Sequence, residues 1–322
     1  MRKRTALALM GAMVLLILDS RCAADSARAA IELCLHTLVP VLFPLFVLGA
    51  MLVPWLSSVR VPMLSRVLGV PEGSEGLLVL GCLGGFPVGA ACVAQAVDSG
   101  GLERADGKRM LGIASFCGPS FLFGIIGTAF SLREGAVLFL IQLQTALTVA
   151  AYWPSPSRAA CSVGQMEPVS LPAALRRAIG SMASVCGWVT MAGVAAGFLR
   201  RWLGPLLPEL AQAVLTGLLE LTTGVFALEG LPCPIVPCAA FVCFGGVSVL
   251  LQIGGLAAAA GIPMGDCVRQ KALQGILGAV LAALWICLGP AALVLGFLPL
   301  AAKIAVEISG RMVYNGPRKE GI

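Results

Sequence analysis

Apolar runs, most of them close to 20 residues long, restrict what this chain can fold into. A helix needs about 20 consecutive apolar residues to cross the hydrocarbon core of a bilayer. Strands of a membrane β-barrel would instead alternate apolar and polar residues over about 10 positions. The continuous runs, rich in Leu, Ala and Gly, predict an all-α polytopic transmembrane protein with about eight or nine membrane-embedded segments. They cover residues 5–18, 31–56, 77–97, 111–131, 134–153, 178–199, 210–228, 233–260 and 271–298.

A low content of charged residues supports this interpretation. Only 12% of the residues are charged and 58% are hydrophobic, whereas an ordinary soluble domain is about 25% charged. A chain this poor in charge cannot cover a globular surface with polar groups, so most of its surface must face lipid. The lipid bilayer is therefore the first expected partner, and we expect no nucleic-acid partner.

The N-terminus allows two interpretations. Arg2, Lys3 and Arg4 precede a short apolar stretch, a pattern shared by secretory signal peptides and first membrane helices. Removal of a signal peptide would leave the other apolar runs unexplained. We therefore interpret residues 1–30 as an uncleaved transmembrane helix and a short loop, with the N-terminus in the cytoplasm according to the positive-inside rule.

Helix-breaking residues interrupt one of the apolar runs. The stretch GCLGGFPVGA, residues 81–90, contains Gly84, Gly85, Gly89 and Pro87. Glycine adopts backbone angles closed to other residues, and proline ends a helix and removes one donor. Such a segment is either a helix kinked for close packing or a re-entrant hairpin whose exposed backbone groups line a polar cavity.

The basic residues favour the hairpin. If residues 77–97 crossed the membrane completely, Arg104, Lys108 and Arg109 would lie outside, against the positive-inside rule. A segment that enters the membrane and returns leaves these residues in the cytoplasm. The charge pattern therefore predicts a re-entrant helical hairpin.

Weak internal similarity indicates two related halves. CGPSFLFGIIG at 117–127 aligns with FGGVSVLLQIG at 244–254, and the segment that begins at Ile31 aligns with the one that begins at Ile179. The flanking charges place the starts of the latter two segments on opposite sides of the membrane, as in the inverted repeats of many secondary transporters. We predict two inverted repeats at 31–153 and 178–298, a connecting loop at 154–177 and a polar C-terminal tail at 299–322.

The second half contains an interrupted segment of its own. LLELTTG places Glu220 beside Thr222 and Thr223 in apolar surroundings. An acidic residue within a membrane segment is costly unless it faces a cavity or a partner, which makes Glu220 a functional candidate. Alternatively, Glu220 lies near a helix end and reaches the interface. The sequence does not decide whether this segment is a second hairpin or a full crossing, and so leaves the side of the C-terminus open.

Together these features predict a site for a small polar solute where the two halves meet. The free backbone groups, hydroxyls and amides of the interrupted segments would bind it, and buried amides that only join helices are the alternative for Gln95 and Gln252. The candidate substrate-binding residues are Gly84, Gly85, Phe86, Pro87, Gly89, Gln95, Ser115, Gly118, Pro119, Ser120, Glu220, Thr222, Thr223, Gly245, Gly246, Ser248 and Gln252.

No catalytic or metal-binding pattern stands out in the sequence. Cys233 and Cys238 lack the paired two-residue spacing and the nearby His of a zinc site. The glycine-rich stretch lacks the Lys-Ser/Thr of a phosphate-binding loop, and no Ser/His/Asp set is evident. We expect neither enzymatic activity nor a cofactor or metal ion.

Several segments together resemble a known family. GGFPVGAACVAQAVDSGGLERADGKRMLGIASFCGPSFLFGIIGTAF, preceded by PVLFPLFVLGAML and followed by LLELTTG and FGGVSVLLQI, is similar to the YlbJ-type sporulation integral membrane proteins, which carry nucleoside-recognition (Gate) domains. The resemblance covers about residues 30 to 290. It implies a bacterial endospore former, a cell-membrane location, a role in spore cortex assembly and a fold related to concentrative nucleoside transporters.

Two functions are consistent with these features. One is a transporter-like or gating protein for a small polar solute such as a nucleoside. The other is a non-transporting scaffold whose basic loops recruit spore-assembly partners. Partners in either case would include sporulation membrane proteins or further copies of the chain.

Overall fold

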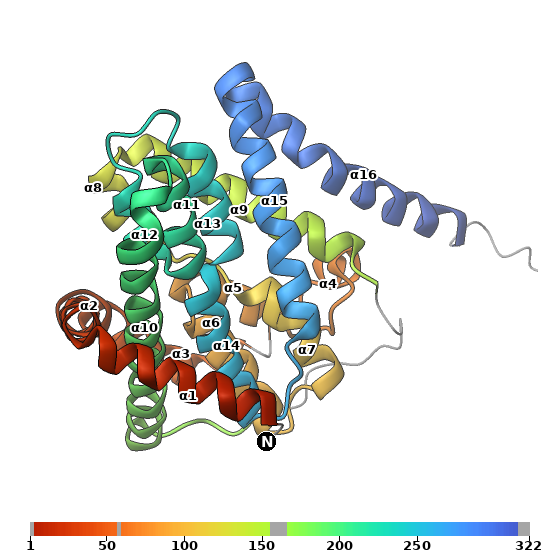
Figure 1. Ribbon diagram of the computed structural model, residues 1–322. Helices are drawn as coiled ribbons and strands as arrows, with labels where there is room; N and C mark the ends of the chain where they lie inside the picture. The colour runs from red at the N-terminus through yellow and green to blue at the C-terminus, as the bar shows by residue number, and fades with distance from the viewer. Residues whose placement is uncertain (1–2, 57–58, 155–165, 315–322) are drawn as a thin grey trace, which may run out of the picture.

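The computed structural model describes residues 3–56, 59–154 and 166–314. Throughout this part of the chain the structure is helical and contains no β-strand (Figure 1). The all-α fold predicted from the apolar runs is therefore confirmed.

The helices follow one another with short connections. The first part of the chain contains α1 (Lys3–Leu18), α2 (Ser20–Leu33), the π-helix η1 (Cys34–Leu38), α3 (Val39–Leu56), α4 (Pro62–Leu68), α5 (Glu75–Gly84), α6 (Val88–Asp98), α7 (Arg104–Ala114), the π-helix η2 (Ser120–Ile126), α8 (Gly127–Ala129) and α9 (Leu132–Tyr152). The second contains α10 (Leu171–Leu203), the 3-10 helix η3 (Gly204–Leu206), α11 (Glu209–Leu219), α12 (Leu221–Ala227), α13 (Ile235–Phe244), α14 (Gly246–Ala259), α15 (Gly265–Leu288) and α16 (Pro290–Tyr314).

Within the described residues, six helical stretches are long and apolar enough to cross a bilayer. This is the composition of a multi-pass membrane protein. The stretches are Ser20–Leu56, Leu132–Tyr152, Leu171–Leu206, Ile235–Ala259, Gly265–Leu288 and Pro290–Ser309.

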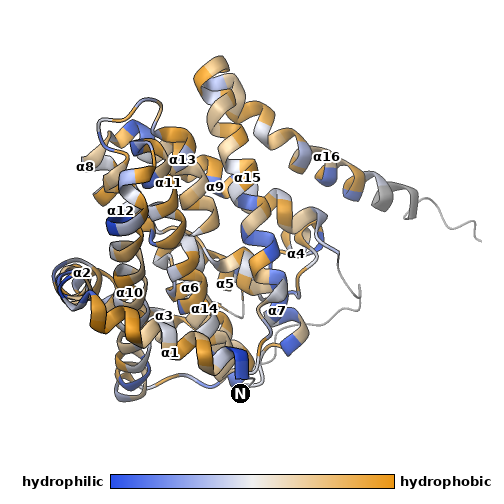
Figure 2. Cartoon of the chain, viewed as in Figure 1, coloured by the Kyte–Doolittle hydropathy of each residue, from blue (hydrophilic) through white to orange (hydrophobic). Residues whose placement is uncertain are grey.

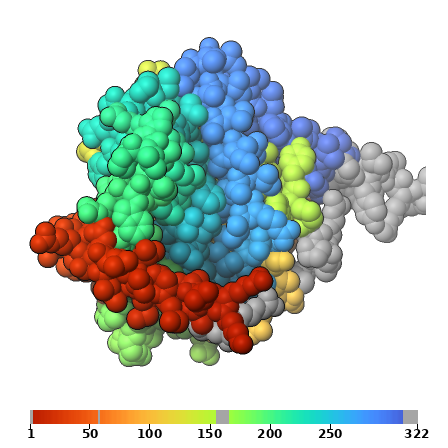
Figure 3. All heavy atoms as spheres, viewed as in Figure 1, coloured from red at the N-terminus to blue at the C-terminus, as the bar shows by residue number. Residues whose placement is uncertain are grey.

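The outermost helices expose apolar side chains. No residue of α1 is buried, and α1 lies across the outside of the other helices in Figure 3. Only 11% of the apolar window of α16 is buried, although most of this helix is hydrophobic in Figure 2. Exposed apolar helix surface of this extent is what contact with lipid requires.

Two expected boundaries are wrong. The short loop expected before residue 31 is helix α2, because its alanines favour a helix and its charged residues fit on an exposed side. The run 271–298 is divided between two helices, and α16 extends through most of the expected polar tail. Gly289, with φ +56°, ends α15, and Pro290 begins α16, which is the usual preference of glycine after a helix and proline at a helix start.

Two pairs of short helices form hairpins. Helices α5 and α6 pack against each other, and so do α11 and α12. A Cβ atom on Gly89 would lie 2.7 Å from the Cα of Gly81 and would collide with the carbonyl oxygen of Ala114. A Cβ on Gly224 would likewise collide with Gly217. Each hairpin therefore closes through a contact that only glycine allows.

Two further helices are broken in their middle. Between α7 and η2, Ser115 adopts an extended backbone and ends the helix. Between α13 and α14, Gly245 and Gly246 have φ values of +94° and +77°. These are the glycines that the internal alignment places opposite the first break.

Both halves of the chain share one order of elements. A long helix (α3 or α10) precedes a hairpin, a broken helix and a second long helix (α9 or α15). That the halves at 31–153 and 178–298 are inverted repeats stays a prediction. The expected loop at 154–177 is shorter than predicted, because α10 begins at Leu171.

Candidate functional site

Three of the four interruptions, those of the two hairpins and of the broken helix between α7 and η2, line one cavity, and α14 borders it one turn after the fourth interruption. This cavity, called here the inner cavity, has a volume of about 250 Å³. Residues of η1, α3 and α10 close its remaining sides. Eight of the predicted site residues line it, namely Gly84, Gly85, Phe86, Gly118, Ser120, Glu220, Thr222 and Gln252.

Gln142 of α9 binds the backbone at the first break. Its Oε1 accepts a hydrogen bond of 2.6 Å from the N–H of Cys117, and its Nε2 donates one of 3.0 Å to the carbonyl oxygen of the same residue. Both residues are buried. Since unpaired backbone groups are costly away from water, Gln142 stabilises the extended segment.

Polar side chains of α15 bind the carbonyl end of α7. The Nζ atom of Lys271 donates to the carbonyl oxygen of Ser115 at 2.9 Å, and Nε2 of Gln274 donates to that of Gly112 at 3.0 Å. Lys271 also donates to Oε1 of Gln274 at 2.9 Å. A cation at the carbonyl end of a helix is favoured by the helix dipole.

Lys271 also links this break to the first hairpin. Its Nζ atom lies 5.0 Å from the centre of the Phe86 ring, within cation–π range. Lys271 is fully buried, whereas Phe86 lines the inner cavity. The ammonium group therefore lies behind the cavity wall.

Glu220 occupies the tip of the second hairpin. Its carboxylate accepts hydrogen bonds from the N–H groups of Thr222 and Thr223, at 3.2 and 2.7 Å, and from the Thr223 hydroxyl at 2.7 Å. It is thus the N-cap of α12, where a negative charge is stabilised by the free N–H groups. The predicted alternative, a helix end that reaches the interface, does not fit its 4% exposure.

The two halves touch beside the inner cavity. A Cβ atom on Gly245 would lie 3.2 Å from the Phe86 ring, so the second break packs against the tip of the first hairpin. In α14, which follows the second break, Nε2 of Gln252 donates to the Ser248 hydroxyl at 3.1 Å. Within the described chain, the hydroxyls of Ser120 and Thr222 have no hydrogen-bond partner, so they are available to a solute.

Other predicted site residues close a hairpin, bond to the backbone or precede a helix, and do not line the inner cavity. Gly89 closes the first hairpin, and the Ser115 hydroxyl donates to the carbonyl oxygen of Leu111. Pro87 and Pro119 immediately precede α6 and η2, and the Phe86–Pro87 peptide bond is cis. The structure does not place these residues, or Thr223, Gly245, Gly246 and Ser248, in the lining of the inner cavity.

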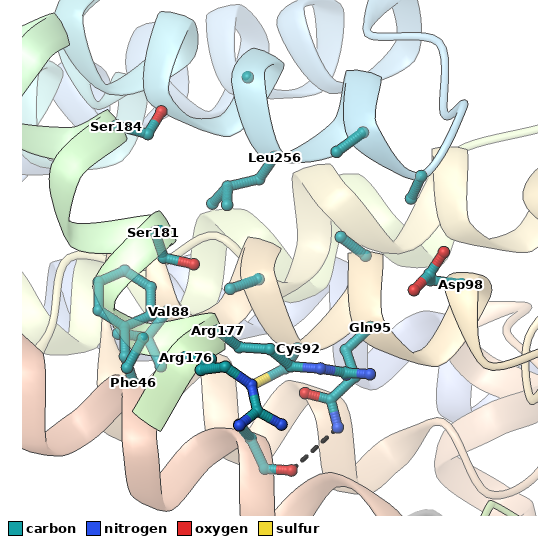
Figure 4. Close-up of a pocket in the computed structure, with 18 residues that line it drawn as sticks. Phe46, Val88, Cys92, Gln95, Asp98, Arg176, Arg177, Ser181, Ser184 and Leu256 are labelled. Carbon is teal, nitrogen blue, oxygen red and sulfur yellow. Dashed lines mark hydrogen bonds between the residues drawn. The ribbon is translucent and has the colours of Figure 1, made fainter. Parts of the chain in front are cut away.

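Gln95 lies in a second cavity, called here the outer cavity, of about 400 Å³ between α3, α6, α10 and α14. Its Nε2 donates to the carbonyl oxygen of Ala50 at 2.9 Å, the bond drawn in Figure 4. Arg176, Arg177 and Asp98 line the same cavity. Gln95 therefore joins two helices, as its alternative interpretation proposed, and faces a different space from Gln252.

Gln142, Lys271 and Gln274 are not among the site residues predicted from the sequence. A signal was available, since Gln270, Lys271 and Gln274 recur at helical spacing just inside an apolar run. Their partners on α7 lie more than 150 residues away in the chain. No local pattern links them to that break.

The described part of the chain contains no group of three His, Cys, Asp or Glu side chains placed to hold a metal ion. Comparison with known proteins gives no identification: no family model, no curated protein and no solved structure matches this chain.

Proposed function

We propose that this protein binds a small polar solute in the inner cavity and conducts it across the membrane, without covalent chemistry. The observation that carries the proposal is the convergence of three helix interruptions on one cavity, which α14 borders just beyond the fourth. Irregular backbone at membrane depth is tolerated where it is buried in protein or lines a polar cavity, and discontinuous helices build the solute sites of many transporters.

The polar side chains around the inner cavity fall into two classes. Gln142, Lys271 and Glu220 engage backbone groups at the interruptions and so hold the wall in place. Ser120 and Thr222 offer hydroxyls to the cavity from the two halves. A solute rich in hydroxyl and amide groups, such as a nucleoside, matches this chemistry, and the resemblance to nucleoside-recognition domains favours the same class.

The helix order also supports a cytoplasmic location for the basic loops. With the N-terminus inside, α1 and α2–α3 taken as an outward and a returning crossing, α7–α8 taken as an outward crossing and both hairpins re-entrant, α9 returns, α10 leads outward and α13–α14 returns. Arg104, Lys108, Arg176 and Arg177 then all lie inside, in agreement with the positive-inside rule. With α15 and α16 taken as separate crossings, the C-terminus also returns to this side.

The biological role proposed from the resemblance is a contribution to endospore formation in the bacterial cell membrane. Deleting the gene in the source bacterium and measuring heat-resistant spores tests this role. Loss of resistance rescued by the wild-type chain, but not by cavity variants, would connect the solute site with sporulation.

The binding test is a thermal-unfolding measurement on the detergent-purified protein with uridine, adenosine and guanosine. A nucleoside at 100 times its Kd stabilises the folded state by about 2.7 kcal/mol, so the unfolding midpoint should rise. Thr222→Val removes a cavity hydroxyl and should weaken binding about 3- to 10-fold, the equivalent of one hydrogen bond. Thr190→Val is the matched control, because this hydroxyl bonds to the Cys186 carbonyl oxygen of its own helix, α10.

Three outcomes separate the possibilities. Stabilisation that Thr222→Val weakens and Thr190→Val leaves unchanged supports the proposal. Stabilisation insensitive to Thr222→Val and Ser120→Ala would move the site elsewhere. No stabilisation by any of the nucleosides would reject that solute class.

A further inference from the structure

Polar side chains from several helices line the outer cavity, and none of them has a role in the proposed function. Ser181 and Ser184 of α10 lie one and two helical turns after Arg177, so all three share a side of the helix. Figure 4 shows these side chains with the opposite wall of α6, which contributes Gln95 and Asp98. The cavity is therefore lined by polar groups from helices of both halves of the chain.

The inner and outer cavities lie end to end along the same helices. On the first hairpin and α14, residues that line the inner cavity are followed within one helical turn by residues that line the outer cavity, and on α10 they are preceded by them. The inner and outer members of these pairs are Phe86 and Val88, Val185 and Ser184, and Gln252 and Gly255. Since the shift occurs in three separate elements, the outer cavity continues the inner one toward the beginning of α10.

The outer cavity carries an excess of positive charge. Among the ion pairs of the described residues, none involves Arg176, Arg177 or Asp98, and Asp98 is drawn apart from the arginines in Figure 4. Two guanidinium groups and one carboxylate therefore line a space of about 400 Å³. Charges of one sign along a cleft concentrate small ions of the opposite sign.

We propose that the outer cavity is the entrance to the inner cavity and that Arg176 and Arg177 make it admit anionic solutes in preference to cationic ones. Small polar solutes that carry a carboxylate or phosphate group, or no net charge as in a nucleoside, would then enter in preference to cationic ones. This inference rests on the proposed function, because it takes the inner cavity as the solute site.

Charge-selective labelling tests the entrance without any solute. Single cysteines at Ser181 and Ser184, in a version of the chain depleted of other cysteines, are treated with sulfonatoethyl and trimethylammonium-ethyl methanethiosulfonate. These reagents are similar in size and opposite in charge. The protein is labelled in detergent, where the reagents reach both ends of α10. After normalisation to an exposed cysteine at Leu206, beyond the far end of α10, we expect the anionic reagent to react about tenfold faster relative to the cationic one.

Variants separate charge from folding. Arg176→Gln with Arg177→Gln should abolish the preference, whereas Arg176→Lys with Arg177→Lys should retain it because the charges remain. Arg200→Gln, on the far end of the same helix, should leave the preference unchanged. A preference lost in the lysine variant would overturn the electrostatic explanation.

Two results, measured with Arg176 and Arg177 unchanged, would reject the inference. Failure of both reagents to reach Ser181→Cys would mean that the outer cavity is not a water-filled entrance. Equal normalised rates would mean that it does not select by charge. Because no solute is used, a preference for the anionic reagent can coexist with a failed nucleoside-binding test, so the two proposals fail separately.

Discussion

Replacing Gln142 by Leu tests whether the first break depends on a side chain of another helix. The substitution removes both hydrogen bonds to Cys117, at 2.6 and 3.0 Å, and leaves its N–H and C=O buried without partners. Each unsatisfied group costs about 1–3 kcal/mol. The free energy of unfolding should therefore fall by about 2–6 kcal/mol.

The assay is thermal unfolding of the purified protein in detergent, followed by the loss of the monodisperse species. One kcal/mol corresponds to about 2–4 °C for domains of 150–250 residues, so the midpoint should fall by at least about 4 °C. Gln144→Leu is the matched control on the same helix. It breaks one hydrogen bond, to the Leu293 carbonyl oxygen, and removes an Oε1 atom that is already buried without a partner.

The control should therefore cost less than Gln142→Leu. Equal midpoints for the two variants, or a Gln142→Leu protein as stable as the wild type, would refute the reasoning. Such a result would mean that the backbone at Cys117 finds another partner and that the break is not held by α9.

Three further substitutions test other parts of the structure. Arg109→Met should lower the unfolding midpoint far more than Lys108→Met, because Arg109 donates to the carbonyl oxygens of Leu68, Ala150, Trp153 and Pro154. Lys108 instead makes a partly exposed ion pair with Asp266, worth at most about 1 kcal/mol. Similar midpoints for the two variants would contradict this role of Arg109. Glu220→Ala should lower the free energy of unfolding by about 0.5–2 kcal/mol through loss of the α12 cap, and Glu220→Gln should lower it less, since an acceptor oxygen remains. The same thermal assay compares the two variants, and a larger loss of stability in Glu220→Gln would argue against capping. Gly89→Ala should destabilise the first hairpin through its collision with Ala114, whereas Gly180→Ala, with open space around it, should be neutral or stabilising; indistinguishable midpoints would show that the hairpin tolerates a wider spacing.

The sequence predicts the interruptions because their chemistry is local. Gly85 and Pro87 do not continue a helix easily, and basic residues on both flanks argue against a full crossing. The same reasoning identifies Glu220 as a special position. Eight of the residues that line the inner cavity are therefore among those expected from the sequence, whereas the apolar lining residues of η1, α3 and α10 are not.

The supporting residues could not be predicted in this way. Gln142 and Lys271 act on backbone groups of distant segments, and only the packing of α9 and α15 against α7 brings them there. The division between α15 and α16 is a different case. Gly289 and Pro290 form a local stop and start signal, which the long apolar run obscured.

Membrane labelling on either side of the first hairpin tests the central claim most directly. Single cysteines at Val59, before α4, and Ser99, after α6, are both at exposed positions, and Leu206 serves as the reference for the opposite side. With a membrane-impermeant thiol reagent, the re-entrant arrangement predicts that Val59→Cys and Ser99→Cys are labelled from the same side and Leu206→Cys from the other. Labelling of Val59→Cys and Ser99→Cys from opposite sides would make residues 77–97 a full crossing and contradict the cavity built from paired hairpins.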